Sequence, residues 1–285
     1  MSKILCVAGP TASGKTDLAI ELALSLGGEV VSCDSMQVYR GMDIGTAKPT
    51  MDERRGVAHH LLDVADPWEL YSVARYVQDA GDCIADIIRR GKLPIVCGGT
   101  GMYLDALIYG LHGAGGDEAI RAALELQDAG ELHTELKTVD PASAMRIDPN
   151  DKRRIIRALE VYRATGVTIT EHHRKSRENP VYNACVIGIR WERAALYARI
   201  DTRVDSMIAA GLFEEARRLK GMNPCRTCLQ AVGYKEDGAA AIKQATRNLA
   251  KRQMTWFNAK SYVQWADAPN IFELATQIVK KCGLQ

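Results

Sequence analysis

The sequence predicts an α/β fold in which a parallel sheet is flanked by helices and interrupted by a helical insertion domain. Three observations support this. Short apolar runs alternate with amphipathic stretches at both ends of the chain, which is typical of strands joined by helices. A glycine-rich turn separates the first apolar run from the first helical stretch. A long middle stretch has helical periodicity and no confident strand.

The first third of the chain contains three apolar runs that we interpret as strands. Residues 3–8 are β-rich and end at Gly9, and Leu18, Leu22 and Leu26 then recur at helical spacing. The expected elements are, in order, a strand over 3–8, a helix over 14–26, a strand over 29–32, a helix over 73–90, a strand over 93–97 and a helix over 102–109.

The pattern changes at a glycine-rich break over residues 112–116. Only helices are expected from 117 to 178, followed by a strand over 184–191 and helices over 193–210, 212–220 and 238–262. We therefore expect a core domain made of residues 1–111 and 184–285. Residues 112–183 would form a mainly helical insertion.

A phosphate-binding loop follows the first strand. Residues 9–16 match G-x-x-x-x-G-K-[ST] at every fixed position, with the strand before it and the helix after it that this motif requires. Backbone N–H groups and the helix N-terminus would surround a phosphate, Lys15 would contact its outer oxygens, and Thr16 would ligate Mg²⁺. The predicted phosphate-binding site comprises Gly9, Pro10, Thr11, Ala12, Ser13, Gly14, Lys15 and Thr16, and the fold is expected to resemble the P-loop NTPases.

The loop indicates a polyphosphate ligand without identifying it. The Asn-Lys-x-Asp motif of GTPases is absent, and the strand over 93–97 runs into Gly98-Gly99-Thr100-Gly101 where an NTPase usually has a metal-binding Asp. Asp34 follows the second strand, so it should face the loop across the ligand crevice. By position alone it is a metal ligand, a turn cap or a general base. A P-loop small-molecule kinase remains the alternative function.

An ordered set of further motifs resembles the bacterial tRNA dimethylallyltransferase family over nearly the whole chain. The matching stretches are GPTASGKT at 9–16, DSMQVYRGMDIGTAKPT at 34–50, HHLLDVADP at 59–67, GGTGMYLDALIYGL at 98–111, RIDPNDKRRIIRALEVY at 146–162, QAVGYKE at 230–236 and ATRNLAKRQMTWF at 245–257. The phosphate loop alone occurs in many folds, but the ordered set is specific.

The resemblance implies transfer of a dimethylallyl group from dimethylallyl diphosphate to N6 of adenosine 37 in the tRNA anticodon loop, with Mg²⁺. Asp34 resembles the family's general base, Thr100 a residue of the reaction channel, and Lys15 and Arg203 residues that contact the diphosphate. Two segments resemble parts that contact tRNA: Asp34, Ser35, Met36 and Gln37 at the flipped-out adenosine, and Leu229, Gln230, Ala231, Val232, Gly233 and Tyr234 at the anticodon stem–loop. Some relatives act on free adenine nucleotides, but the helical insertion favours tRNA.

Basic residues gather in three places although the formal net charge is only +2. Each cluster alone indicates a solvated helix face, but three together make a phosphate-backbone footprint plausible. The resemblance implies that the first cluster, with Lys152, Arg153, Arg154 and Arg157, faces the anticodon stem–loop. The others are the cluster at residues 172–177 and the cluster of Arg247, Lys251 and Arg252.

The remaining features favour a cytoplasmic monomer without a membrane segment or leader peptide. Cysteines in apolar runs, such as Cys6 and Cys97, indicate small buried residues rather than disulfides. Cys225 and Cys228 form a C-x-x-C with no second pair of zinc ligands at suitable spacing. A third class of function, a nucleic-acid-binding module with a vestigial phosphate loop, is disfavoured because Gly14, Lys15 and Thr16 are intact.

Overall fold

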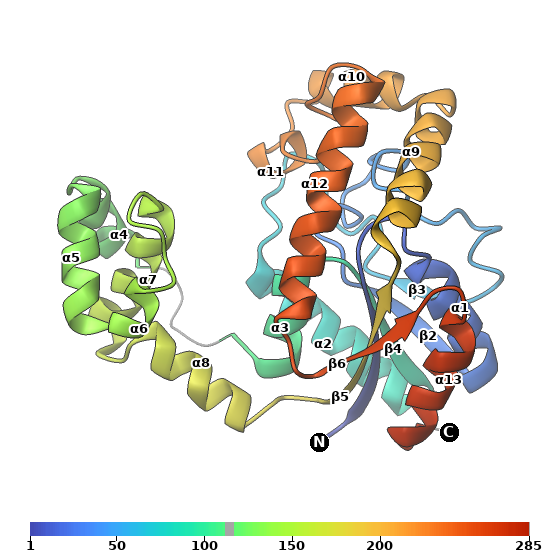
Figure 1. Ribbon diagram of the computed structural model, residues 1–285, viewed down its shortest axis with the longest axis horizontal. Helices are drawn as coiled ribbons and strands as arrows, with labels where there is room; N and C mark the ends of the chain where they lie inside the picture. The colour runs from blue at the N-terminus through green and yellow to red at the C-terminus, as the bar shows by residue number, and fades with distance from the viewer. Residues whose placement is uncertain (112–116, 285) are drawn as a thin grey trace. The chain divides into compact units, whose positions relative to one another are not determined.

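The computed structural model describes residues 1–111 and 117–284. The chain divides into two compact units (Figure 1). One combines Met1–Ile108 with the chain from Tyr182 onward, and the other is Tyr109–Val181. The glycine-rich break at 112–116 lies outside the described residues.

The first unit is built on a six-stranded parallel sheet in the order β3-β2-β4-β1-β5-β6. Its strands are β1 (Lys3–Ala8), β2 (Gly28–Ser32), β3 (His59–His60), β4 (Leu93–Gly98), β5 (Asn183–Arg190) and β6 (Val263–Asp267). The central strand β1 is buried from Ile4 onward, which explains its continuous apolar run. The prediction of a parallel sheet flanked by helices is confirmed.

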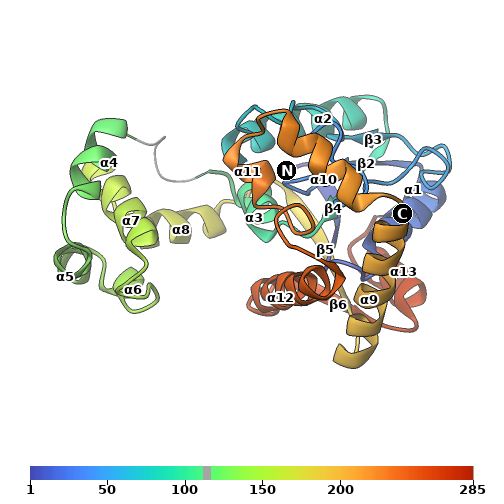
Figure 2. The same ribbon diagram turned by 90° about the horizontal axis from the view of Figure 1, so that it is seen from above.

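Helices cover both faces of this sheet (Figures 1 and 2). On one face α1 (Lys15–Leu26) and α13 (Ile271–Lys281) enclose a core that includes Leu5, Ile95 and Ile187. On the other face α2 (Val73–Arg89) buries Tyr76, and the ring of Tyr76 stacks on Tyr103 of α3 (Gly101–Tyr109) with 4.4 Å between centroids. The predicted bounds of α1, α2 and α3 agree with the structure within two residues.

Four helices extend the unit beyond the carboxyl ends of the strands (Figure 1). They are α9 (Arg193–Ala209), α10 (Leu212–Gly221), α11 (Arg226–Leu229) and α12 (Ala239–Asn258). A second apolar core, which includes Ile200 of α9, Leu212 of α10 and Ala250 of α12, joins these three helices to Ala12 in the phosphate loop. The helical extension is therefore packed directly against the loop expected to bind phosphate.

In the second unit, the regular secondary structure of the described residues consists of helices alone. It contains α4 (Glu118–Glu125), α5 (Ala129–Val139), α6 (Pro141–Ala144), α7 (Lys152–Thr165) and α8 (Ile169–Glu178) around a core that includes Leu132 and Leu159. Glu160 is buried beside this core and is paired with Arg121 and Arg157. The expectation of helices without strands is confirmed for residues 117–178.

The C-terminal region differs from the prediction. The helix expected over 238–262 ends at Asn258, and strand β6 and helix α13 follow it. Cys185 and Cys282 form a disulfide that joins β5 to the residue after α13, although the sequence indicated no disulfide. Cys6 and Cys97 are buried and free, as predicted. No helix in the described part of the chain combines the length and apolar content needed to cross a bilayer.

Candidate active site

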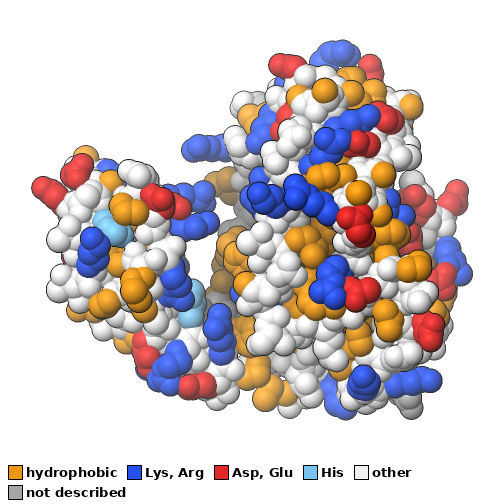
Figure 3. Space-filling view, in the orientation of Figure 1, with side chains coloured by type: hydrophobic (Ala, Val, Ile, Leu, Met, Phe, Trp, Pro, Cys, Tyr) orange, Lys and Arg blue, Asp and Glu red, His pale blue; other side chains and the backbone are white. Residues whose placement is uncertain are grey.

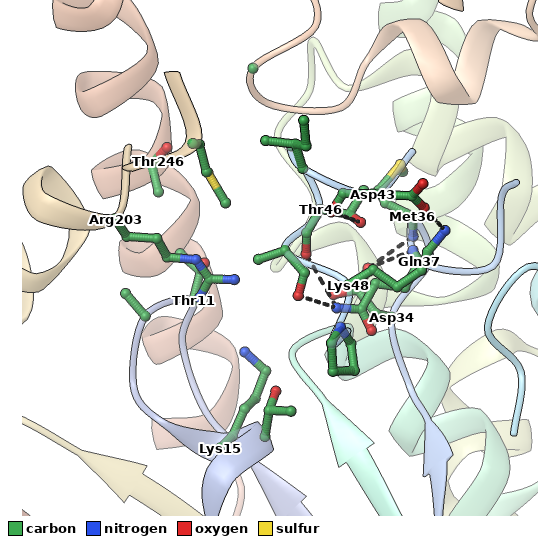
Figure 4. Close-up of a pocket in the computed structure, with 18 of the residues that line it drawn as sticks. Thr11, Lys15, Asp34, Met36, Gln37, Asp43, Thr46, Lys48, Arg203 and Thr246 are labelled. Carbon is green, nitrogen blue, oxygen red and sulfur yellow. Dashed lines mark hydrogen bonds and ion pairs between the residues drawn. The ribbon is translucent and has the colours of Figure 1, made fainter. Parts of the chain in front are cut away.

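A cavity of about 870 Å³ opens at the carboxyl edge of the sheet. Its lining comes from the phosphate loop, the segment after β2, the end of β4, and helices α9 and α12. Parallel strands place their carboxyl ends together at such a crevice. Figure 4 shows Lys15 and Arg203 on one side and Asp34, Gln37 and Thr46 on the other. One cavity therefore brings together residues that are distant in sequence.

The phosphate loop leaves the N-terminus of α1 open. Gly14 has φ +86°, a conformation that glycine adopts readily, and no described side chain caps the helix. Ser13 Oγ is buried and has no hydrogen-bond partner within the described residues. Uncapped N–H groups and the positive end of the helix dipole favour an anion at this position. The local structure thus suits a phosphate group.

Two cationic side chains, Lys15 and Arg203, enter the cavity without a carboxylate partner in the described chain. Burial, and then the nearby charge of Arg203, lower the pKa of Lys15. Burial likewise lowers the pKa of Arg203, although Asp34 and Asp17 act in the opposite direction. Neither side chain forms an ion pair within the described residues, and Lys15 Nζ donates only to Pro10 O at 3.3 Å. An anionic ligand would relieve the cost of holding these charges together.

Asp34 lies on the opposite wall of the cavity, and one of its two carboxylate oxygens accepts hydrogen bonds from the backbone. Its Oδ1 accepts hydrogen bonds from the N–H groups of Met36 at 2.9 Å and Gln37 at 3.4 Å. No described residue bonds to Oδ2. The capping role that its position suggested is therefore real, and it leaves the second oxygen available to accept a proton from a ligand.

Thr100 forms hydrogen bonds with the segment that carries Asp34. Its Oγ1 accepts the N–H of Ser35 at 3.1 Å, and its own N–H donates to Cys33 O at 3.3 Å. Gly98, two residues earlier, lines the cavity, whereas Thr100 is not part of the lining. In this structure Thr100 therefore supports the segment that carries Asp34.

Three side chains that the sequence had not marked as site residues hold the phosphate loop in place. Gln253 of α12 accepts the N–H of Thr11 at 2.8 Å and donates to Gly99 O at 3.1 Å. Trp191 donates to Ser13 O at 2.9 Å, and Arg199 donates to Ala12 O at 2.8 Å. The motif ATRNLAKRQMTWF contained Gln253, but no local pattern indicated its partners.

The loop over residues 42–50 forms much of the wall beside Asp34. Lys48 is buried, and its Nζ bonds to Asp43 Oδ1 at 2.6 Å, Asp63 Oδ1 at 2.5 Å and Tyr39 O at 2.9 Å. Gln37 Nε2 donates to Thr46 O at 3.2 Å and to the carbonyl of the next residue (Figure 4). Gln37, expected to contact tRNA, thus also connects Asp34 to this loop.

The segment over residues 229–234 meets the cavity from the helical extension. Ala231, Val232 and Gly233 line the cavity, while Gln230 is exposed. Tyr234 is only 2% exposed and donates to Glu215 at 2.6 Å. The tyrosine side chain therefore packs inside the protein, and the surface that this segment can offer to RNA comes from its other residues.

The basic clusters differ in how much of their charge is free. In the helical unit Arg153 is exposed without an ion-pair partner in the described chain, whereas Arg154 pairs with Asp151 and Arg157 with Glu160. Lys152 donates to Glu125 O at 2.8 Å. In the other clusters Arg174 pairs with Glu171 and Glu178, and Arg247 with Asp201. Figure 3 shows Lys and Arg interspersed with Asp and Glu on the drawn surface.

The cysteine motif and metal ligation can be assessed from geometry. Cys225 Sγ and Cys228 Sγ lie 3.7 Å apart as free thiols. Within the described ranges, no three His, Cys, Asp or Glu side chains gather in a way that could hold a metal ion. Thr16, expected to ligate Mg²⁺, lines the cavity in the first turn of α1.

Two family models match the chain. One is described as IPP transferase and matches residues 37–260, and the other is described as isopentenyl transferase and matches residues 2–66. Together they span the phosphate loop, Asp34, the helical unit and all of α12.

Curated relatives and solved structures agree with these models. The chain is 47% identical to the tRNA dimethylallyltransferase of Anoxybacillus flavithermus, covering 95% of this chain and 93% of the relative. It is 47% identical to that of Geobacillus thermodenitrificans, covering 97% and 94%. The structure of a tRNA isopentenylpyrophosphate transferase from Bacillus halodurans matches with a TM-score of 0.74 and 39% identity, covering 99% of this chain and 97% of that one. A eukaryotic dimethylallyltransferase crystallised while acting on tRNA matches with a TM-score of 0.81 and 29% identity, covering 99% and 77%. The chain therefore belongs to the IPP transferase family.

Proposed function

We propose that the chain transfers the dimethylallyl group of dimethylallyl diphosphate to N6 of adenosine 37 in the tRNA anticodon loop and releases diphosphate. The family makes the chain a tRNA prenyltransferase rather than a P-loop kinase. The observation that carries the residue assignment is one cavity in which Lys15 and Arg203, which form no ion pair with the described residues, face Asp34, whose Oδ2 has no hydrogen-bond partner among them. We propose that the enzyme acts as a monomer in the cytoplasm, where its tRNA substrate is found.

The donor side of the cavity suits a diphosphate leaving group. As the allylic C–O bond breaks, negative charge grows on the diphosphate oxygens. Lys15, Arg203 and the open N-terminus of α1 are fixed positive groups beside the site where this charge develops. Such preorganised groups stabilise a transition state without having to reorganise. They also bind the donor in the ground state.

The acceptor side suits an adenine amine, which is a weak nucleophile because its lone pair is delocalised into the ring. Asp34 would accept the amine proton on Oδ2 as the new C–N bond forms, while Met36 and Gln37 hold Oδ1. The base has to leave its stack to reach the cavity. A single-stranded loop makes this step cheaper than in a duplex.

The residues present fit a magnesium ion. Mg²⁺ usually keeps several waters and binds through one or two protein groups together with substrate phosphates, so it needs no cage of carboxylates. Thr16 would hold the ion with oxygens of the diphosphate. When bound, the ion would neutralise charge on the leaving group.

The test is an incubation of the purified protein with Mg²⁺, dimethylallyl diphosphate and unmodified tRNA, followed by nucleoside mass spectrometry. We expect a nucleoside heavier by one dimethylallyl group, and none from a matched tRNA with guanosine at position 37. AMP as acceptor tests for transfer to free nucleotides. Absence of the product, together with ATP-dependent phosphorylation of a small metabolite, would support the kinase and remove Asp34 from its assigned role.

A further inference from the structure

The loop beside Asp34 is held by one buried carboxylate from a distant helix. Glu215 of α10 is 4% exposed and has no cationic partner in the described chain. Its Oε2 accepts the N–H groups of Asp43 and Ile44, both at 2.9 Å, and its Oε1 accepts that of Gly45 at 3.0 Å. Buried carboxylates are normally paired with a cation or satisfied by several hydrogen bonds. Here backbone donors of the cavity wall satisfy it.

Tyr234 and Glu215 together form a clamp on this loop. Its hydroxyl donates to Glu215 Oε1 at 2.6 Å, and burial, followed by this hydrogen bond, raises the pKa of Tyr234 above its usual value. The ring also lies against Gly45, because a Cβ added to that glycine would be 2.5 Å from Tyr234 Cε2. Any side chain at position 45 would therefore collide with the ring. The clamp thus fixes the loop by hydrogen bonds and by shape.

A chain of hydrogen bonds leads from the clamp to Asp34. The carbonyls of Thr46 and Ala47, directly after the clamped amides, accept the side-chain amide of Gln37 at 3.2 and 3.3 Å. Ser32 donates to the other end of this side chain at 3.1 Å. The backbone N–H of Gln37 in turn donates to Asp34 Oδ1. The position of the loop is thereby connected to the orientation of the carboxylate.

We infer that Glu215, held by Tyr234, is a positioning residue for the acceptor half of the reaction. It fixes the loop over residues 43–47 so that Gln37 and Asp34 keep their orientation toward the adenine amine. The inference rests on the proposed function. Lys15 and Arg203 lie on the opposite side of the cavity (Figure 4), so loss of the clamp should impair turnover much more than donor binding.

The test compares Glu215→Ala with Glu214→Ala, since Glu214 is the exposed neighbour on the same helix and forms no described hydrogen bond. We expect kcat for tRNA prenylation to fall about 100-fold in Glu215→Ala, as for a misplaced reacting group. KM for dimethylallyl diphosphate should stay close to wild type, and Glu214→Ala should match wild type in both constants. Glu215→Gln should recover much of kcat, because its amide oxygen can accept two of the backbone donors and its NH₂ can donate to Tyr234.

Amide hydrogen exchange at residues 43–45 gives a readout that does not depend on prenylation. We expect faster exchange in Glu215→Ala, an intermediate rate in Glu215→Gln and an unchanged rate in Glu214→Ala. Unchanged exchange in Glu215→Ala, or a rise in donor KM that matches the loss of kcat, would overturn the inference. If Glu215→Ala does not fold, Glu215→Gln and Tyr234→Phe replace it in the exchange measurement, where both should exchange faster than wild type at residues 43–45. If wild type forms no prenylated nucleoside, the proposed function fails, and exchange at these amides still decides whether Glu215 holds the loop.

Discussion

Charged groups near the two ends of strand β2 differ in whether they have ion-pair partners. At its start Glu29 is 3% exposed and bonds to Arg90 at 2.5 Å, Lys92 at 2.7 Å and His60 at 2.8 Å. Beyond its end the cavity holds Lys15 and Arg203, which have no ion pair in the described chain. Hydrogen bonding to Arg90 is the main cause that lowers the pKa of Glu29, despite its burial. By contrast, burial lowers the pKa of both cavity cations.

This difference separates a structural charge cluster from a functional one. The Glu29 cluster has its partners within the protein, so its charges stabilise the folded state. Burial in the cavity disfavours the charged forms of Lys15 and Arg203, and an anionic ligand would provide a partner for both charges. Functional groups held at a cost to stability are common in active sites. The contrast can be tested by removing one charge at a time.

Asp34→Asn should have the largest effect, because it removes the proposed proton acceptor from the acceptor wall. We expect kcat to fall by about 10²–10⁴-fold, the usual contribution of general base catalysis. The asparagine oxygen can still accept the N–H groups of Met36 and Gln37, so the turn and tRNA affinity should be retained. Steady-state kinetics and filter binding measure the two quantities, with Asp82→Asn on the exposed side of α2 as control. Equal loss of tRNA binding would contradict the assignment of Asp34 as base.

Lys15→Met comes next and tests the donor wall. We expect kcat/KM to fall by about 10²–10³-fold, as when one preorganised charge-stabilising group is removed. The free energy of unfolding should not fall, because the variant removes a charge that burial and Arg203 destabilise. Urea denaturation and prenylation kinetics check both parts, with Lys220→Met on the exposed face of α10 as control. A less stable Lys15→Met protein would show that this cation contributes to folding after all.

Glu29→Gln should show the reverse pattern, with lower stability and normal activity per folded molecule. We expect a loss of about 2 kcal/mol in the free energy of unfolding, because hydrogen bonds between charged groups weaken. The lowered pKa of Glu29 means that its stabilisation is present at neutral pH and is lost as pH falls below the ordinary glutamate range of about 4. The free energies of unfolding of wild type and variant, measured by urea titration, should therefore converge at acid pH. A constant difference across pH would show that packing, and not charge, stabilises this end of β2.

Local motifs predicted the parts of the site that lie near one another in the sequence. The phosphate loop was evident because strand, glycines and helix follow in order, and Asp34 because parallel strands end at one edge. Gln253 and Glu215 were not found, since their partners lie 242 and 171 residues away. Strand β6 was missed for a related reason. It is a five-residue edge strand in which only Val263 and Ala266 are buried, and it closely follows a long helix.

Arg153→Ala should have the smallest effect and sharpens the contrast between unpaired cations. Arg153, like Lys15, has no ion-pair partner among the described residues, but it is exposed on α7, where water and salt screen its charge. We expect tRNA affinity to fall only a few-fold, with the slope of log Kd against log salt decreasing by about 1, as for one lost phosphate contact. Arg163→Ala on the same helix is the control, because Arg163 already pairs with Glu135 at 2.7 Å. Fluorescence anisotropy with an anticodon stem–loop over a range of salt concentrations measures the slope. An unchanged slope would mean that Arg153 is a solvated side chain, and that an unpaired cation indicates a ligand only where the protein also removes it from water.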